Sequence, residues 1–150
     1  MTVTEFFKEK VSFFSGLSDE EAHELAEASE QLTFKPGHSI IMQGMTVDGL
    51  HVIAEGKVSV WIKPQGKPSV QVATLGPGEV FGERSIVELG LAGATIKALE
   101  ETLVFMVRQD AFLKLIAAKP ALLDYIKNQI AERRKALVNN PKAEQPPKAP

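Results

Sequence analysis

The chain has 150 residues, a formal net charge of −2 and no cysteine. One domain is the usual expectation at this length, and the lack of cysteine excludes disulfides, thiolate zinc sites and cysteine nucleophiles. The small net charge disfavours a nucleic-acid partner, which usually needs a strongly basic face, and no apolar run approaches the ~18 residues of a membrane span, so we expect a cytoplasmic protein.

The N-terminal third of the chain predicts helices. A short helix ends at Ser15-Gly16, and a second one begins at the capping box of Ser18 and Glu21 and continues to about Glu30. Four aromatic residues share one face of the first helix: Phe6, Phe7, Phe13 and Phe14. This face either packs against the rest of the domain, which we favour, or docks a partner.

Residues 32–108 predict strands. Val58, Val60 and Ile62 alternate with a second set, Lys57, Ser59, Trp61 and Lys63, which is the period of a half-buried strand. Further short apolar runs end at glycine-containing turns, and they fall at 32–34, 39–42, 50–54, 70–75, 94–98 and 103–107. Short strands at this spacing predict an α+β protein built on an antiparallel β-roll or jelly roll, a double-stranded β-helix.

The C-terminal part predicts two helices and a tail. Asp110 can cap a helix over 111–118, Lys119-Pro120 breaks it, and a long helix follows over 121–138 with Pro120 at its start. Residues 139–150 are rich in proline and lack large apolar side chains, so we expect a domain over 1–138 and a disordered tail over 139–150. The long helix carries an apolar face of Leu123, Ile126, Ile130 and Leu137.

The most informative motif is Phe81-Gly82-Glu83, within 75–83 and followed by 94–98. It resembles the phosphate-binding cassette of the cyclic nucleotide-binding domains. Residues 13–18, 34–44 and 50–60 are similar to other parts of that family, so the resemblance covers about 14–138. It implies a β-roll between N-terminal helices and a C-terminal helical segment.

The cassette needs its residue types for physical reasons. Gly82 lets the backbone approach a sugar-phosphate, and the N-terminus of a short helix after it favours an anion. The resemblance implies that the carboxylate of Glu83 accepts a hydrogen bond from a ribose hydroxyl and that Thr95 can touch phosphate or base. An arginine of the family would neutralise the cyclic phosphate, but Ala92 stands at its position.

Arg84 is a second departure from the family, which has an apolar residue there. Its guanidinium could replace the missing phosphate ligand, or it could pair with Glu83 and Glu88 on the surface, which we favour. The candidate site, a relic or weak phosphate-binding cassette, therefore consists of Phe81, Gly82, Glu83, Arg84, Ser85, Ala92 and Thr95.

Other kinds of site find little support. His23, His38 and His51 have no metal-ligand spacing and are expected at the surface or in turns. The glycines before Gly82 do not have the spacing of a dinucleotide fingerprint, and no carboxylate pair or nucleophile motif indicates an enzyme. We expect no metal and no resident cofactor.

The predicted function is a stand-alone, degenerate cyclic nucleotide-binding-like domain that acts as a non-enzymatic regulatory protein-interaction module. About a dozen residues follow the last helix, too few for a DNA-binding helix-turn-helix. The alternative is a signalling sensor that still binds cAMP, cGMP or another phosphate ligand through the retained cassette residues. The helix over 121–138 is expected either to form a homodimer, as in related domains, or to pack on its own barrel.

Overall fold

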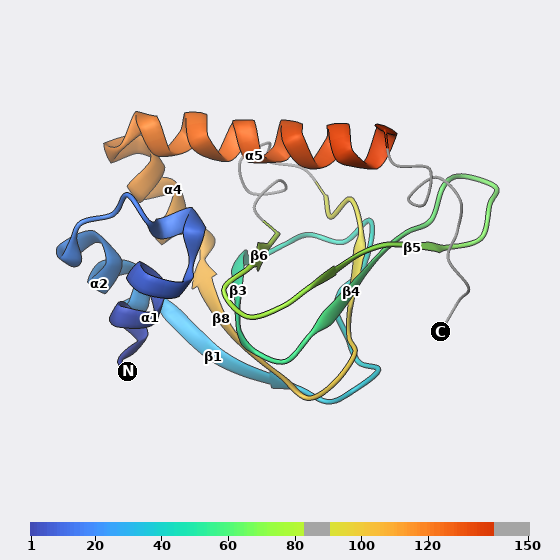
Figure 1. Cartoon of the computed structure of the whole chain (residues 1–150), viewed down its shortest axis with the longest axis horizontal. Coiled ribbons are helices and arrows are strands. Elements are labelled where there is room, and N and C mark those ends of the chain that lie inside the picture. Colours follow the sequence, from blue (N-terminus) through green and yellow to red (C-terminus); the bar gives the residue numbers. More distant parts are fainter. Residues whose placement is uncertain (83–90, 140–150) are drawn as a thin grey trace.

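A computed structural model describes residues 1–82 and 91–139, apart from the side chains of 126, 129, 130 and 133–139. Eight described strands form two antiparallel sheets that face each other as a β-roll (Figure 1). One sheet has the order β1-β8-β3-β6 and the other β2-β7-β4-β5. The strands are β1 (Ser29–Phe34), β2 (Ser39–Ile41), β3 (Gly49–Glu55), β4 (Val58–Ile62), β5 (Val70–Leu75), β6 (Val80–Phe81), β7 (Thr95–Ala98) and β8 (Thr102–Arg108). The predicted roll is confirmed.

The space between the two sheets is filled by an apolar group of side chains, here called the interior cluster. Its buried members are Ile41, Val47, Ile53, Val58, Phe81, Ala92, Ile96 and Val104. Side chains alternate along a strand, so Val58 faces this cluster while Ser59 and Trp61 lie on the outer face of β4. There the Trp61 Nε1–H donates to Ser59 Oγ over 2.8 Å.

Most of the helices lie at one end of the molecule, against the outer face of the β1-β8-β3-β6 sheet, whereas the last helix extends from that end along the top of the roll (Figure 1). The helices are α1 (Val3–Lys10), the 3₁₀ turn η1 (Ser12–Phe14), α2 (Asp19–Glu27), α4 (Gln109–Ala118) and α5 (Pro120–Asn139). Phe7 and Phe14 are fully buried, and Phe6 packs on Phe105 with ring centroids 6.3 Å apart. Each buried ring contributes about 1.5–3 kcal/mol. The aromatic face is therefore packed, and the docking alternative is wrong.

Several helix boundaries differ from the sequence prediction. The first helix, predicted to end at Ser15-Gly16, ends at Lys10 and is followed by the separate turn η1. The predicted capping box of Ser18 and Glu21 is present, but α2 ends at Glu27, and Ser29 already pairs with Val107. Pairing with β8 overrides the helical propensity of the residues after Glu27. Asp110 does not cap α4; it lies within the first turn and makes an ion pair with Arg108, 3.5 Å from Nε to Oδ1.

A lysine joins the two helical ends of the chain. Lys119, between α4 and α5, donates from Nζ to the Gly16 carbonyl oxygen (2.8 Å) and to Glu21 Oε1 (2.7 Å). The hydrogen bond from Lys119 lowers the pKa of Glu21. Tyr125 adds an edge-to-face contact on Phe13, with ring centroids 5.8 Å apart. These contacts anchor the first turns of α5 on the N-terminal helices.

The apolar face predicted on α5 is described only at Leu123, which is half-buried against the helical core. The side chains of Ile126, Ile130 and Leu137 lie outside the described part, as does the tail after residue 139. The homodimer therefore stays a prediction. Among the described helices, none combines the length and the apolar character that crossing a membrane requires.

Candidate functional site

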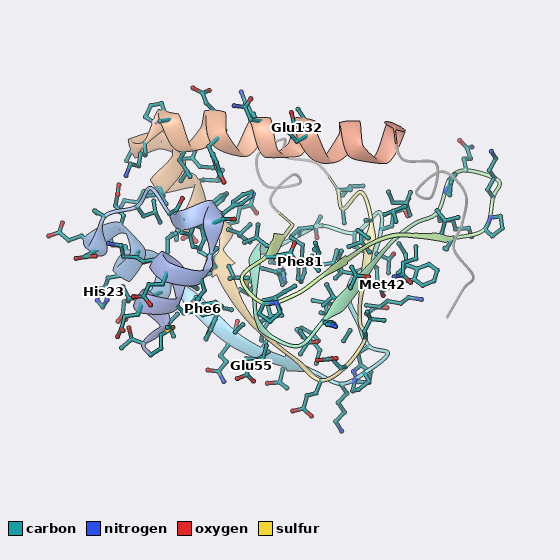
Figure 2. The ribbon with its side chains drawn as sticks, in the orientation of Figure 1. Phe6, His23, Met42, Glu55, Phe81 and Glu132 are labelled. Carbon is teal, nitrogen blue, oxygen red and sulfur yellow. The ribbon has the colours of Figure 1, made fainter. Side chains whose placement is uncertain are left out.

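The candidate site begins where β6 ends. Val80 and Phe81 pair with Val52 and His51 of β3, and Phe81 is 3% exposed within the interior cluster. Figure 2 shows Phe81 in the middle of the molecule, between the helical residues Phe6 and His23 on one side and Met42 on the other. The last residue of this short strand, Phe81, therefore places the backbone of the cassette at the interior of the roll.

Gly82 then turns the chain with a positive φ of 87°. A Cβ at this position would lie 3.2 Å from both the Gly49 carbonyl oxygen and Val47 Cγ1. The conformation and the close approach both favour glycine, because side chains rarely adopt a positive φ. The structure thus explains why glycine follows Phe81, independently of any ligand.

His51 forms a wall of this turn that the sequence analysis missed. Its ring stacks on Phe81 with centroids 4.9 Å apart and planes 17° apart, and its Nδ1 lies 3.1 Å from the Gly49 carbonyl oxygen. It lies on the same face of β3 as Ile53, a member of the interior cluster. The expectation of a surface or turn histidine is wrong for His51, which is 7% exposed.

The environment of His51 favours the neutral imidazole. Burial lowers its pKa to about 4, and the opposing effects of the Gly49 carbonyl and of the Asp48 charge are smaller. A neutral imidazole can donate Nδ1–H to the carbonyl and keep Nε2 as an acceptor. At neutral pH His51 therefore adds no positive charge to the interior.

Ala92 closes the site from the other side. Its backbone bridges to the loop after β2: Gly44 N donates to the Ala92 carbonyl oxygen and Ala92 N donates to the Met45 carbonyl oxygen, each over 2.8 Å. Its methyl group belongs to the interior cluster together with Phe81, and the residue is 7% exposed. Where the resemblance implies an arginine, this chain places a small apolar group fixed by two backbone hydrogen bonds.

Thr95 points away from the interior. It pairs with Trp61 across the sheet, whereas the neighbouring pair of Ile96 and Val60 faces inward. Its hydroxyl oxygen accepts a hydrogen bond from Gln43 N (3.0 Å). The same outer face holds the Lys97 ammonium, 5.2 Å from the centre of the Trp61 ring. A ligand contact from Thr95 stays a prediction, because in the described geometry its hydroxyl oxygen accepts the hydrogen bond from Gln43 N.

The interior also offers apolar surface that the sequence analysis did not include. Val60 and Leu75 pack against the interior cluster but are only half-buried. The alternation of β4 is the signal that could have indicated Val60. In the described part of the chain, the buried polar side chains are His51, Ser59 and Thr102, so no ammonium or guanidinium is buried there.

The structure thus brings Phe81, Gly82 and Ala92 to one region, whereas Glu83, Arg84 and Ser85 lie outside the described residues. Within residues 1–82 and 91–139, no three or more His, Asp or Glu side chains come together where they could hold a metal ion.

Comparison with known proteins gives a consistent result. A family model for the cyclic nucleotide-binding domain matches residues 31–119. The chain is 30% identical over 120 residues to the cyclic AMP receptor protein of Thermus thermophilus, a match that covers 80% of this chain and 56% of that protein. The chain therefore spans little more than half the length of this relative.

Two solved structures share the fold. The regulatory domain of Toxoplasma gondii PKA, crystallised with cAMP, superposes with a TM-score of 0.81 at 22% identity, over 87% of this chain and 49% of that one. The catabolite activator protein of Thermus thermophilus superposes with a TM-score of 0.71 at 29% identity, over 85% of this chain and 59% of that one.

Proposed function

The chain belongs to the cyclic nucleotide-binding domain family, and we propose that it is a non-enzymatic regulatory domain with a degenerate nucleotide site that acts by binding another protein. The observation that carries this proposal is the environment of Ala92. The position that the family resemblance assigns to a phosphate-binding arginine holds a buried methyl group, pinned by hydrogen bonds to Gly44 and Met45.

The missing guanidinium matters for affinity, because charge-assisted hydrogen bonds from an arginine are the strongest that a side chain can donate to a cyclic phosphate. Removing one partner of a buried charged pair costs about 2–5 kcal/mol, or roughly 30-fold to several thousand-fold in affinity. No cation is buried among the described residues, and Lys97 lies over Trp61 on the outer face. Both observations support a weak site.

The second candidate is a sensor that still binds cAMP, cGMP or another phosphate ligand. The glycine turn at Gly82 and the half-buried apolar surface of Val60 and Leu75 favour it, because both would suit a nucleotide. This function would need Arg84 to supply the charge that Ala92 lacks. The relatives are named for cAMP, so this nucleotide is the first ligand to test.

A thermal melt with nucleotide separates the two functions. Ligand at a hundredfold its dissociation constant adds about 2.7 kcal/mol of stability, and each kcal/mol raises the melting temperature of a chain of this size by roughly 2–4 °C. We expect no shift with cAMP or cGMP at about 1 mM, a concentration a hundredfold above the Kd of a ~10 μM site. A shift of several degrees that Arg84→Ala abolishes would establish the sensor instead.

If the protein acts by binding a partner, the cassette residues should not be needed for that binding. Once a partner is identified, Glu83→Ala should change its affinity by no more than a few fold, as measured by titration calorimetry. A partner whose binding requires added cAMP or cGMP would contradict this expectation.

We also propose a homodimer through α5. An apolar helix face is covered either by its own domain or by a second copy, and a two-fold interface uses the same face twice. We expect light scattering to give twice the 16.3 kDa chain mass, and Ile126→Asp to return the monomer. Asn128→Asp, which adds the same charge at an exposed position of α5, is the control. A monomer at high micromolar concentration in both variants and in the wild type would exclude this dimer.

A further inference from the structure

The proposed function gives no role to His51, whose side chain forms a wall of the glycine turn. Its ring lies on the inner face of β3 and stacks on Phe81, its partner in the strand register. Its Nδ1 lies 3.5 Å from the position that a Cβ on Gly82 would take. A charge on this imidazole would therefore lie directly beside the backbone of the cassette.

One nitrogen of this ring has no partner in the described structure. Nδ1 lies 3.1 Å from the Gly49 carbonyl oxygen, whereas Nε2 makes no hydrogen bond to a described residue. Because no side-chain nitrogen or oxygen among the described residues is both fully enclosed and unpaired, Nε2 must reach open space, although His51 is only 7% exposed. In the neutral ring Nδ1–H donates to Gly49, so a proton taken up from solvent adds an N–H at Nε2. Protonation therefore gives His51 both a charge and a new donor.

The described side chains packed around His51 are uncharged. Across the sheet it pairs with Met106 of β8 on one side and with Phe81 of β6 on the other. The interior cluster, which includes the inward-facing residues of the opposite sheet, is apolar throughout. The described interior thus holds no counter-ion that would keep His51 protonated in the free protein, which agrees with its lowered pKa.

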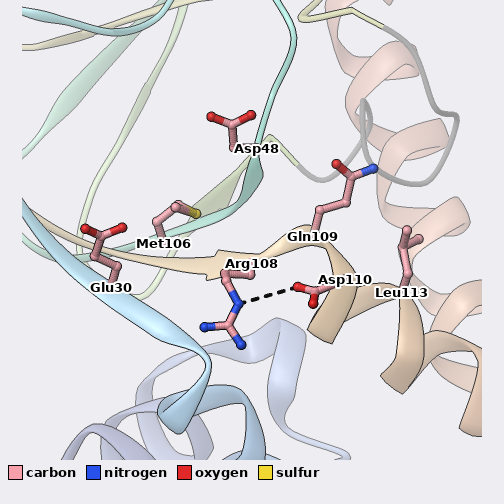
Figure 3. Close-up of a pocket in the computed structure, with 7 residues that line it drawn as sticks. All are labelled: Glu30, Asp48, Met106, Arg108, Gln109, Asp110 and Leu113. Atoms are coloured by element: carbon pink, nitrogen blue, oxygen red, sulfur yellow. Dashed lines mark ion pairs between the residues drawn. The ribbon is translucent and has the colours of Figure 1, made fainter.

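The charged groups on this side of the sheet lie at the ends of β1, β3 and β8, as Figure 3 shows. Asp48 precedes β3, and its negative charge favours the protonated imidazole, but the effect of burial is larger. Glu30 lies two strands away, on β1. Arg108 points away from Asp48 and pairs with Asp110 of α4. This leaves His51 as the described side chain beside the glycine turn that can become a cation.

We propose that a protonated His51 takes the place of the missing arginine, so that the glycine turn binds a cyclic phosphate together with one proton. The imidazolium Nε2–H donates a charge-assisted hydrogen bond to a phosphate oxygen. The proton comes from solvent and remains on the imidazole, and no bond of the nucleotide changes. This inference rests on the proposed function and refines it: the site is weak at neutral pH, where the imidazole is neutral, and gains a counter-charge in acid.

Such a site binds its ligand more tightly in acid. Burial lowers the pKa of His51 to about 4 in the free protein, and a phosphate beside the ring raises this pKa because it favours the charged form. A group whose pKa rises on binding strengthens the binding as the pH falls through the pKa of the complex. We therefore expect cAMP to bind about tenfold more tightly at about pH 5 than at about pH 7.5.

The histidine ring signals of the full chain, followed by NMR, test the proposal directly. We expect cAMP to move the titration of His51 to higher pH and to leave those of His23 and His38, which are exposed, unchanged. Adenosine has the same base and ribose but no phosphate, and it should leave all three titrations unchanged. The spectrum of His51→Phe identifies the His51 signal.

Two variants separate the charge of His51 from its packing. His51→Phe keeps the stack on Phe81 but cannot take up a proton, so it should bind cAMP with the same weak affinity at the two pH values. His38→Gln removes an exposed histidine outside the turn and should keep the pH dependence of the wild type. Circular dichroism at the lower pH verifies that the wild type and both variants are folded.

Different results reject different claims. The role of His51 would be overturned by equal wild-type affinity at both pH values, by the same pH dependence in His51→Phe, or by equal movement of all three histidine titrations. Micromolar binding of cAMP at neutral pH that tightens further in acid would reject the degenerate site and leave the role of His51 in place. No binding of cAMP at either pH would reject the role of His51 and leave the degenerate site standing.

Discussion

Ala92→Arg is expected to destabilise the nucleotide-free protein and to make it respond to cAMP. The substitution puts a guanidinium at a position that is 7% exposed and packed in the interior cluster, without a described counter-charge. We expect the free energy of unfolding to fall by about 2–4 kcal/mol, because burying an unpaired charge is costly. A cyclic phosphate would supply the missing partner, so cAMP at a hundredfold its dissociation constant should return about 2.7 kcal/mol.

Urea unfolding with and without cAMP measures both quantities. Ala92→Leu is the matched control, because it adds volume without charge and should cost about 1–3 kcal/mol through overpacking. The leucine variant should not recover stability with cAMP. If the arginine variant behaves like the leucine variant in both respects, position 92 does not face a phosphate site, and the explanation for weak nucleotide binding fails.

The stability of the protein is expected to fall between pH 6.5 and pH 4 because of His51. Its pKa is 6.5 in an unfolded chain and about 4 in the fold, so the unfolded chain binds a proton first as the pH drops. Stability therefore decreases as the pH falls through this window, by up to about 3 kcal/mol at its lower end. Above pH 6.5 the imidazole is neutral in both states and contributes no pH dependence.

His51→Phe isolates this effect. Phenylalanine keeps the stack on Phe81 but cannot take up a proton, so the difference in stability between wild type and variant should change with pH only in this window. Carboxylates such as Glu21 titrate in both proteins and cancel in the comparison. The charge of Asp48 favours the protonated form of His51, so Asp48→Asn should steepen the wild-type dependence. Parallel curves for wild type and His51→Phe would refute the assignment.

The alternation of β4 correctly predicted that Val58 and Val60 face the interior, but Ser59 and Trp61 on the other face are buried as well, at 1% and 5% exposed. The same alternation, counted from Ile96, places Thr95 on the outer face, whereas the resemblance implies a contact with phosphate or base. β3 is different, because helices cover one of its faces and the interior cluster touches the other. A strand buried on both sides shows no alternation, so the position of His51 could not be read from the sequence.

Tertiary pairing explains the other differences. Residues 28–31 have a helical composition, and only the partner strand β8 reveals that Ser29 and Glu30 belong to a sheet. The motif predicted a close backbone approach at Gly82 and showed Ala92 at the position of the family's arginine. The two hydrogen bonds that hold Ala92, however, join it to a loop about fifty residues earlier. Contacts between such distant segments leave no local signal in the sequence.

The bridge from Lys119 to Glu21 spans 98 residues of chain. A single ion pair between two partly exposed side chains is too weak to close so long a loop by itself, so this bridge should form after the roll has brought its two partners together. Folding would then proceed from the strands outward, with the N-terminal helices docking late. Pulse-labelled hydrogen exchange should show the amides of β3 and β8 protected before those of α2. During synthesis on the ribosome, the first helices of the chain would remain undocked until α4 has emerged.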